Sequence, residues 1–257
     1  MLALGGAHDP TDARGAWNAF ARHIDRPVGI VVASAHNERR ATTVASAPDY
    51  ETIHDFRGFP APLYALSYRA HGDADLAARC ATLLAAAGLP PRRELSPGLD
   101  HGAWVPLAAL FPEGDVPIVQ LAIEPHRDAA HHLALGRALR PLRDEGVLVL
   151  GSGSLTHNLA ELDGSVAAPS ASPVVAPHVA AFRAWVWGRL AANDVEALVD
   201  YQRSAPAAAR VHPTDEHWLP FYVALGAIGD ARFTAAPVAG GVAFGALAMD
   251  AIAFRSA

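Results

Sequence analysis

VGIVVA at residues 28–33, PIVQLAI at 117–123 and VLVLG at 147–151 are short, almost uninterrupted apolar runs rich in β-branched residues, and residues 42–46 form a fourth candidate. Runs of this length indicate β-strands. Because they lack the alternation of a half-exposed strand, both faces of the sheet should be covered. They therefore predict a buried central sheet that is mostly parallel or mixed.

Longer segments with the helical spacing of apolar residues separate and follow these runs. Four of them begin at plausible N-cap residues, namely Thr11, Asp73, Asp128 and Thr214. The predicted helices are 11–24, 73–88, 128–145, 177–192 and 214–228. Alternating strands and helices are typical of α/β proteins. We predict one α/β domain over residues 1–257, with a central mostly parallel or mixed sheet flanked by helices.

Two later segments have a different composition. Residues 163–177 are rich in Gly, Ser and Pro, which predicts an irregular surface segment. Residues 232–255 mix small and apolar residues, and we expect them to return a strand or hairpin to the sheet.

The composition points to a small-molecule partner. Hydrophobic residues make up 51% of the chain, enough for a core, and the net charge of -6 without blocks of Lys or Arg argues against nucleic acid or a membrane surface. The first residues lack a secretory signal, and the single cysteine, Cys80, cannot form an intrachain disulfide. These features fit a cytoplasmic protein, and they leave the oligomeric state open.

The 13 histidines are the unusual feature of the composition. Five follow apolar runs or lie in turns, where an α/β sheet carries its ligand-binding loops, and a sixth falls in the first turn of a predicted helix. These six are His8, His36, His54, His101, His157 and His217. A lone histidine is more often a surface or hydrogen-bonded core residue, and no compact HExxH motif is present. A metal site would have to gather donors from distant loops.

Several phrases of the sequence together resemble one family. They are SAH at 34–36, TIHDFRGFP at 52–60, LDHGAWVPL at 99–107, VPIVQLAI at 116–123, GSGSLTHNL at 151–159 and HPTDEHWLPFYVALGA at 212–227. They resemble the class III extradiol ring-opening dioxygenases, a LigB-like family of the DOPA-dioxygenase type. The resemblance spans nearly the whole chain.

The resemblance implies a non-haem metal centre and assigns roles to particular residues. The implied ligands of a ferrous ion, which zinc can replace in isolated proteins, are His54, His217 and a histidine of the first loop. The resemblance implies His157 as the acid/base near the metal or a further ligand, and His101 as a catalytic residue of the substrate pocket. Asp100, His36 and Trp218 are predicted to contact the substrate; Asp100 could also orient His101.

The first loop departs from the family pattern. Where the family usually reads HGSP, this chain reads LALGGAHDP, so Gly6 or Ala7 holds the usual histidine position. His8 lies close by, and we expect it to serve as the shifted ligand. The sequence then predicts an Fe(II)-dependent enzyme that opens a catechol-type, DOPA-like ring with O2. A zinc hydrolase using the same histidines, or a non-catalytic zinc- or aromatic-binding relative, are the alternatives.

Overall fold

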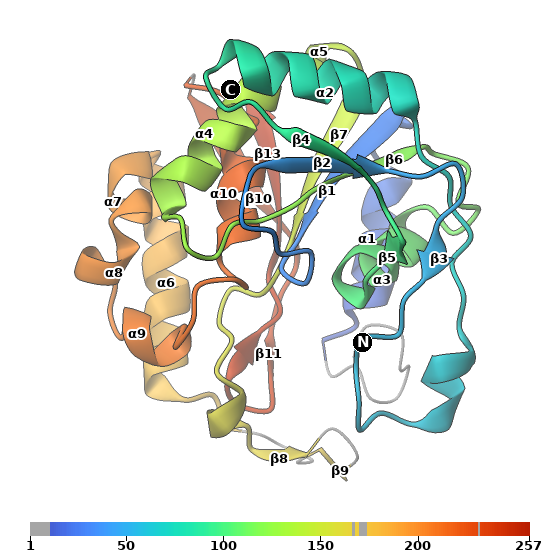
Figure 1. Cartoon of the computed structure of the whole chain (residues 1–257). Coiled ribbons are helices and arrows are strands. Elements are labelled where there is room, and N and C mark those ends of the chain that lie inside the picture. The colour runs from blue at the N-terminus through green and yellow to red at the C-terminus, as the bar shows by residue number, and fades with distance from the viewer. Residues whose placement is uncertain (1–10, 166–167, 170–173, 231) are drawn as a thin grey trace.

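The computed structural model describes residues 11–165, 168–169, 174–230 and 232–257. Its centre is a five-stranded sheet in the order β4-β2-β6-β1-β7 (Figure 1). The strands are β1 (Gly29–Ser34), β2 (Thr43–Ser46), β4 (Arg92–Leu95), β6 (Ile118–Leu121) and β7 (Val147–Ser152). The four predicted strands are present, and the prediction of an α/β domain with a central sheet flanked by helices is confirmed. β1 and β6 are buried, whereas β7 is partly buried and the edge strand β4 is exposed.

The sheet is mixed. β1 runs parallel to both β6 and β7, and β2 runs parallel to β4, but β2 pairs antiparallel with β6. Because β1, β6 and β7 are parallel, their carboxyl ends meet at one edge of the sheet. In open α/β sheets this edge is the usual place for a ligand site.

The alternating side chains of β1 explain why both faces of the sheet are covered. Ile30 and Val32 join one core cluster, and Val31 and Ala33 join another. On the first face lie α1 (Ala13–Ala21) and α3 (His101–Leu110), and on the second lie α2 (Ala74–Ala86), α4 (Ala129–Leu139) and α10 (Leu219–Gly226) (Figure 1).

The second half of the chain adds a helical layer beyond α10 and a separate hairpin. The helices of this layer are α6 (Pro177–Ala192), α7 (Val195–Val199), α8 (Tyr201–Ser204) and α9 (Ala208–Val211). The short α5 (Pro141–Asp144) instead packs with α4 and β7, and short 3-10 turns lie at Ala61–Ala65 and Leu159–Glu161. The hairpin pairs β10 (Phe233–Ala239) with β13 (Ala251–Ser256). Two-residue strands form three further pairs among the described residues: β3 (Glu51–Thr52) with β5 (Gly98–Leu99), β8 (Gly164–Ser165) with β9 (Ala168–Pro169), and β11 (Val242–Ala243) with β12 (Leu247–Ala248).

Several boundaries differ from the prediction. Asp73 and Asp128 cap their helices as predicted, but the first helix begins after Asp12, and α10 begins only at Leu219, so Thr214 is not an N-cap. The predicted C-terminal hairpin forms a sheet of its own and does not join the central one. Residues 1–10, with the predicted ligand His8, lie outside the described residues.

Among the described residues, no helix combines the length and the apolar character that crossing a membrane requires.

Candidate metal centre

His36 and His101 meet at the carboxyl edge of the sheet. His36 follows the end of β1 by two residues, and His101 is the first residue of α3; their ring centroids are 4.1 Å apart. Gly102 makes this approach possible. A Cβ atom there would lie 2.4 Å from the Ser34 Oγ atom and 3.1 Å from the His36 ring, so both side chains would have to move away. The glycine of the DHG phrase is therefore needed for α3 to begin this close to β1.

Asp55 is the carboxylate between these two histidines. Its Oδ1 atom accepts hydrogen bonds from the main-chain N–H and the Nδ1 atom of His101, both at 2.9 Å, and its Oδ2 atom lies 3.6 Å from Nδ1 of His36. Partial burial raises the pKa of Asp55, but the bonds from His101 outweigh it and bring the pKa to about 2. The carboxylate is then ionised and accepts only, so Nδ1 of His101 carries a proton, and in the neutral form of the ring the lone pair is at Nε2.

A second group of donors lies opposite, from the loops before α10 and after β7. The rings of His157 and His217 stack with centroids 3.4 Å apart and planes 6° apart. Glu216 accepts a hydrogen bond from Nδ1 of His217 at 3.0 Å and another from the Thr214 hydroxyl at 3.0 Å. The bond from Nδ1 leaves Nε2 of His217 with a free lone pair.

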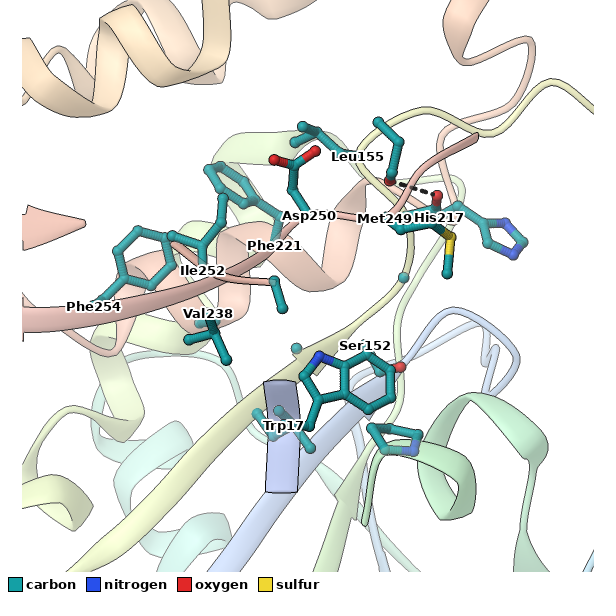
Figure 2. A pocket seen from close by; sticks show the side chains of 18 of the residues that line it. Trp17, Ser152, Leu155, His217, Phe221, Val238, Met249, Asp250, Ile252 and Phe254 are labelled. Atoms are coloured by element: carbon teal, nitrogen blue, oxygen red, sulfur yellow. Dashed lines mark hydrogen bonds between the residues drawn. The ribbon is translucent and has the colours of Figure 1, made fainter. Parts of the chain in front are cut away.

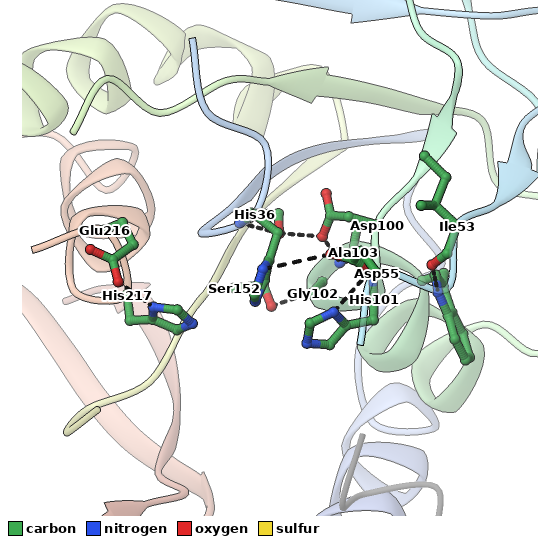
Figure 3. Close-up of polar contacts among 12 residues, drawn as sticks. His36, Ile53, Asp55, Asp100, His101, Gly102, Ala103, Ser152, Glu216 and His217 are labelled. Carbon is green, nitrogen blue, oxygen red and sulfur yellow. Dashed lines mark hydrogen bonds and ion pairs between the residues drawn. The ribbon is translucent and has the colours of Figure 1, made fainter. Parts of the chain in front are cut away.

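The two groups face each other. His36 lies 5.1 Å from His217, centroid to centroid, with the rings at 87°. Figure 3 shows His217 with Glu216 on one side, and His36, His101 and Asp55 on the other. Within each group the candidate ligand atoms lie within 4.8 Å of one another; the groups are His36, Asp55 and His101, and His157, Glu216 and His217.

The environment holds three of these imidazoles in the neutral form. Burial, followed by the neighbouring His217, lowers the pKa of His157 to about 4, and burial lowers that of His217 to about 4 despite its bond to Glu216. Burial and the nearby His101 also lower the pKa of His36. Neutral imidazole is the form that binds metal ions, so this donor set suits a divalent cation.

His54 is not part of either group. In the described chain the candidate ligand atoms gather as above, and His54 instead places its Nε2 atom 2.9 Å from the carbonyl of Leu66, with its ring beside Trp104 and Tyr64. The predicted triad of His8, His54 and His217 is therefore not assembled by the described residues. His217 is in the second group, and His36, which we predicted as a substrate contact, faces it across 5.1 Å.

Two predicted substrate contacts have structural partners. Asp100 is 7% exposed, accepts a hydrogen bond from the Ser34 hydroxyl and caps α3 through the N–H of Ala103. Its suggested role as the partner of His101 is wrong, because Asp55 occupies that place. Trp218 is 1% exposed and donates its indole N–H to the Tyr222 hydroxyl. It packs in the core rather than against open space.

Asp55 and Glu216 were not among the site residues predicted from the sequence. Each is the immediate neighbour of a histidine, in HD at 54–55 and EH at 216–217. Such pairs were visible, but the sequence does not say which histidine each carboxylate contacts. Glu216 contacts its neighbour, whereas Asp55 contacts a histidine 46 residues away.

An apolar cleft of about 220 Å³ lies behind the cluster, between α1, β7, α10 and the C-terminal hairpin. Figure 2 shows Trp17, Phe221, Ile252 and Phe254 along it, with the imidazole of His217 at its end and turned away from them. His36, His101 and His157 do not line it. The imidazoles therefore face a different space from this cleft.

The family of the chain follows from its sequence match over most of its length. Residues 5–241 match the family described as the catalytic LigB subunit of aromatic ring-opening dioxygenase. The protein belongs to this family. The predicted family, fold class and enzyme class are thereby confirmed.

Named relatives and a solved structure agree with this. The chain is 44% identical over 206 residues to a 4,5-DOPA dioxygenase extradiol of Beta vulgaris, covering 80% of this chain and 75% of that protein. It is 36% identical over 236 residues to the 4,5-DOPA dioxygenase extradiol of Escherichia coli K12, covering 91% and 84%. A crystal structure of an uncharacterized protein from Escherichia coli K12 superposes with a TM-score of 0.76 at 31% identity, covering 93% of this chain and 91% of that one.

Proposed function

We propose that the protein is a cytoplasmic, Fe(II)-dependent extradiol dioxygenase that opens the ring of a catechol of the DOPA type with O2. The observation that carries the proposal is the meeting of four imidazoles, His36, His101, His157 and His217, at the carboxyl edge of the sheet. The names of the relatives support the substrate class. Zinc is a plausible occupant of the isolated protein, because imidazole nitrogens bind both metals.

The ring geometry separates ligands from other histidines. His36 and His217 are nearly perpendicular at 5.1 Å, so their in-plane lone pairs can converge on one ion. The rings of His157 and His217 are stacked face to face, with centroids 3.4 Å apart and planes 6° apart, so no ion fits between their faces. We therefore assign His36 and His217 as ligands, with His8 as the third donor, and keep His157 free of the metal.

When bound, a ferrous ion would lower the pKa of the catechol hydroxyls and offer a coordination position for O2. The chain supplies the proton transfers. The pKa of His157 is about 4, so its ring is neutral at pH 7 and can accept a proton from the second hydroxyl. His101, with its lone pair at Nε2, can accept a hydrogen bond from a substrate hydroxyl.

Anaerobic reconstitution with ferrous ion, followed by addition of oxygen and a panel of catechols, tests the proposal. The expected result is oxygen consumption with formation of a yellow semialdehyde from a DOPA-like catechol. The His217→Ala variant should consume no oxygen, and a matched change at the exposed His23, His23→Ala, should behave as wild type. Tight zinc and catechol binding without oxygen consumption would show a binding protein instead.

A further inference from the structure

We infer that Asp55 is a positioning residue, which fixes the tautomer and the orientation of His101 so that Nε2 of this histidine faces the substrate. This inference rests on the proposed function for its role in catalysis. The contact between the two side chains can be tested without that function.

Two hydrogen bonds join Asp55 to His101. One carboxylate oxygen of Asp55 accepts both the main-chain N–H and the Nδ1 proton of His101 at 2.9 Å. An imidazole held at Nδ1 by an acceptor of fixed position keeps its ring plane and exposes Nε2 as the acceptor. Figure 3 shows the His101 ring held at Asp55 on one side, with its outer edge directed away from Asp55.

Other described acceptors do not replace Asp55 at this place. Asp100, the carboxylate next to His101 in sequence, is engaged with Ser34 and with the N-terminus of α3. Oδ2 of Asp55 lies 3.6 Å from Nδ1 of His36, which is too long for a hydrogen bond. The geometry therefore assigns Asp55 to His101 in particular.

The segment that carries Asp55 is anchored to α3 without its carboxylate. Ile53 donates its N–H to the carbonyl of Leu99 at 2.9 Å, and the indole of Trp104 donates to the carbonyl of Ile53 at 3.0 Å. These bonds join the two segments on either side of the Asp55–His101 pair. Removing the Asp55 side chain should therefore leave the fold in place while freeing the imidazole.

The two informative variants are Asp55→Ala and Asp55→Asn. Alanine removes the acceptor. Asparagine can place its carbonyl oxygen where Oδ1 stands and accept both bonds, so it keeps the tautomer and removes the charge. Asp49→Asn is the control, because Asp49 is an exposed carboxylate in the same stretch of chain as Asp55.

The tautomer is measured directly by long-range proton–nitrogen NMR correlation on the zinc-loaded protein, with His101 assigned by a His101→Gln variant. Wild type, Asp49→Asn and Asp55→Asn should show His101 protonated at Nδ1, and Asp55→Ala should shift it toward Nε2. With saturating ferrous ion, kcat of Asp55→Ala should fall about 10- to 100-fold, while Asp55→Asn keeps most of it.

Three results would overturn the inference: an unchanged His101 tautomer in Asp55→Ala, an unchanged kcat in Asp55→Ala, or equal losses in the alanine and asparagine variants. Thermal unfolding of each variant monitors the fold. If wild type opens no catechol while the NMR shift occurs, the proposed function fails and the positioning of His101 stands.

Discussion

His132 should make the protein acid-labile, and the size of the effect follows from its contacts. The ring is 0% exposed. Its Nδ1 atom lies 2.8 Å from the carbonyl of Asp128, and its Nε2 atom accepts the N–H of Glu124 at 3.1 Å. The carbonyl requires a proton on Nδ1 and the N–H requires a lone pair on Nε2. The fold therefore selects one neutral tautomer and has no place for a second proton.

Burial is the main cause that lowers the pKa of His132 to about 4, with the neighbouring His131 acting in the same direction and Glu124 and Asp128 in the opposite one. Because the pKa is depressed in the folded state, stability is full above the unfolded pKa of about 6.5 and is lost as the pH falls toward about 4. A difference of about 2.5 units corresponds to about 3 kcal/mol, of which about 2 kcal/mol is lost by pH 5.

Urea unfolding of the metal-free protein between pH 8 and about 4.5 measures this loss. His132→Gln can still accept from Glu124 but cannot titrate, so its free energy of unfolding should fall by about 2 kcal/mol less than that of wild type on going to pH 5. His23→Gln, at an exposed position, should follow wild type. Parallel pH profiles for wild type and His132→Gln would refute the reasoning, whatever their absolute stabilities.

Three further outcomes test the site and the fold. In a metal titration, His217→Ala should lose more than about 100-fold in metal affinity, because loss of a residue that only hydrogen-bonds a ligand already costs about 10- to 100-fold. His157→Gln should bind the metal normally while its kcat falls about 10²- to 10⁴-fold; loss of metal would make it a ligand. Gly136→Ala should destabilise the fold by about 1–3 kcal/mol in urea, because the new Cβ would lie 2.2 Å from the Val223 carbonyl, whereas Gly188→Ala, with nothing within 4 Å, should not.

The elements that the sequence predicted well have strong local signals. The helix predicted at 177–192 is α6 (Pro177–Ala192), which has Pro at its first position and Asn193 in the left-handed conformation at its end. Three of the four predicted strands match apolar runs, of which β1 and β6 are buried and β7 is partly buried. Local chemistry decides these elements, so tertiary contacts did not need to be known.

The elements that were missed lack such signals. α3 (His101–Leu110) is buried on most sides and contains Pro106, so its sequence shows neither a polar face nor an unbroken helical pattern. β4 (Arg92–Leu95) is the exposed edge strand, and its polar residues give no apolar run. Both elements owe their conformation to neighbours far away in the chain.

The sequence named the histidines that gather at this edge of the sheet, but it could not say which of their side chains converge. The six histidines at strand ends and turns were recognised, and four of them meet. The parallel strands β1 and β7 bring the segments of His36 and His157 together, whereas His101 and His217 come from the starts of α3 and α10. The sequence favoured His54 as a ligand and gave His36 a lesser role. Convergence on a common point depends on the direction of each side chain, which the spacing of motifs does not fix.

The pair His54 and Asp55 shows how one residue decides such a prediction. Side chains of consecutive residues in extended chain point to opposite sides. Just beyond β3, Asp55 faces His36 and His101, whereas His54 turns to Leu66 and Trp104. Both residues belong to the TIHDFRGFP phrase, so recognising the phrase could not separate them. With Asp55 on the site side, His36 at the end of β1 becomes the histidine that faces His217, and the HD pair contributes its carboxylate to the site while its imidazole holds the loop.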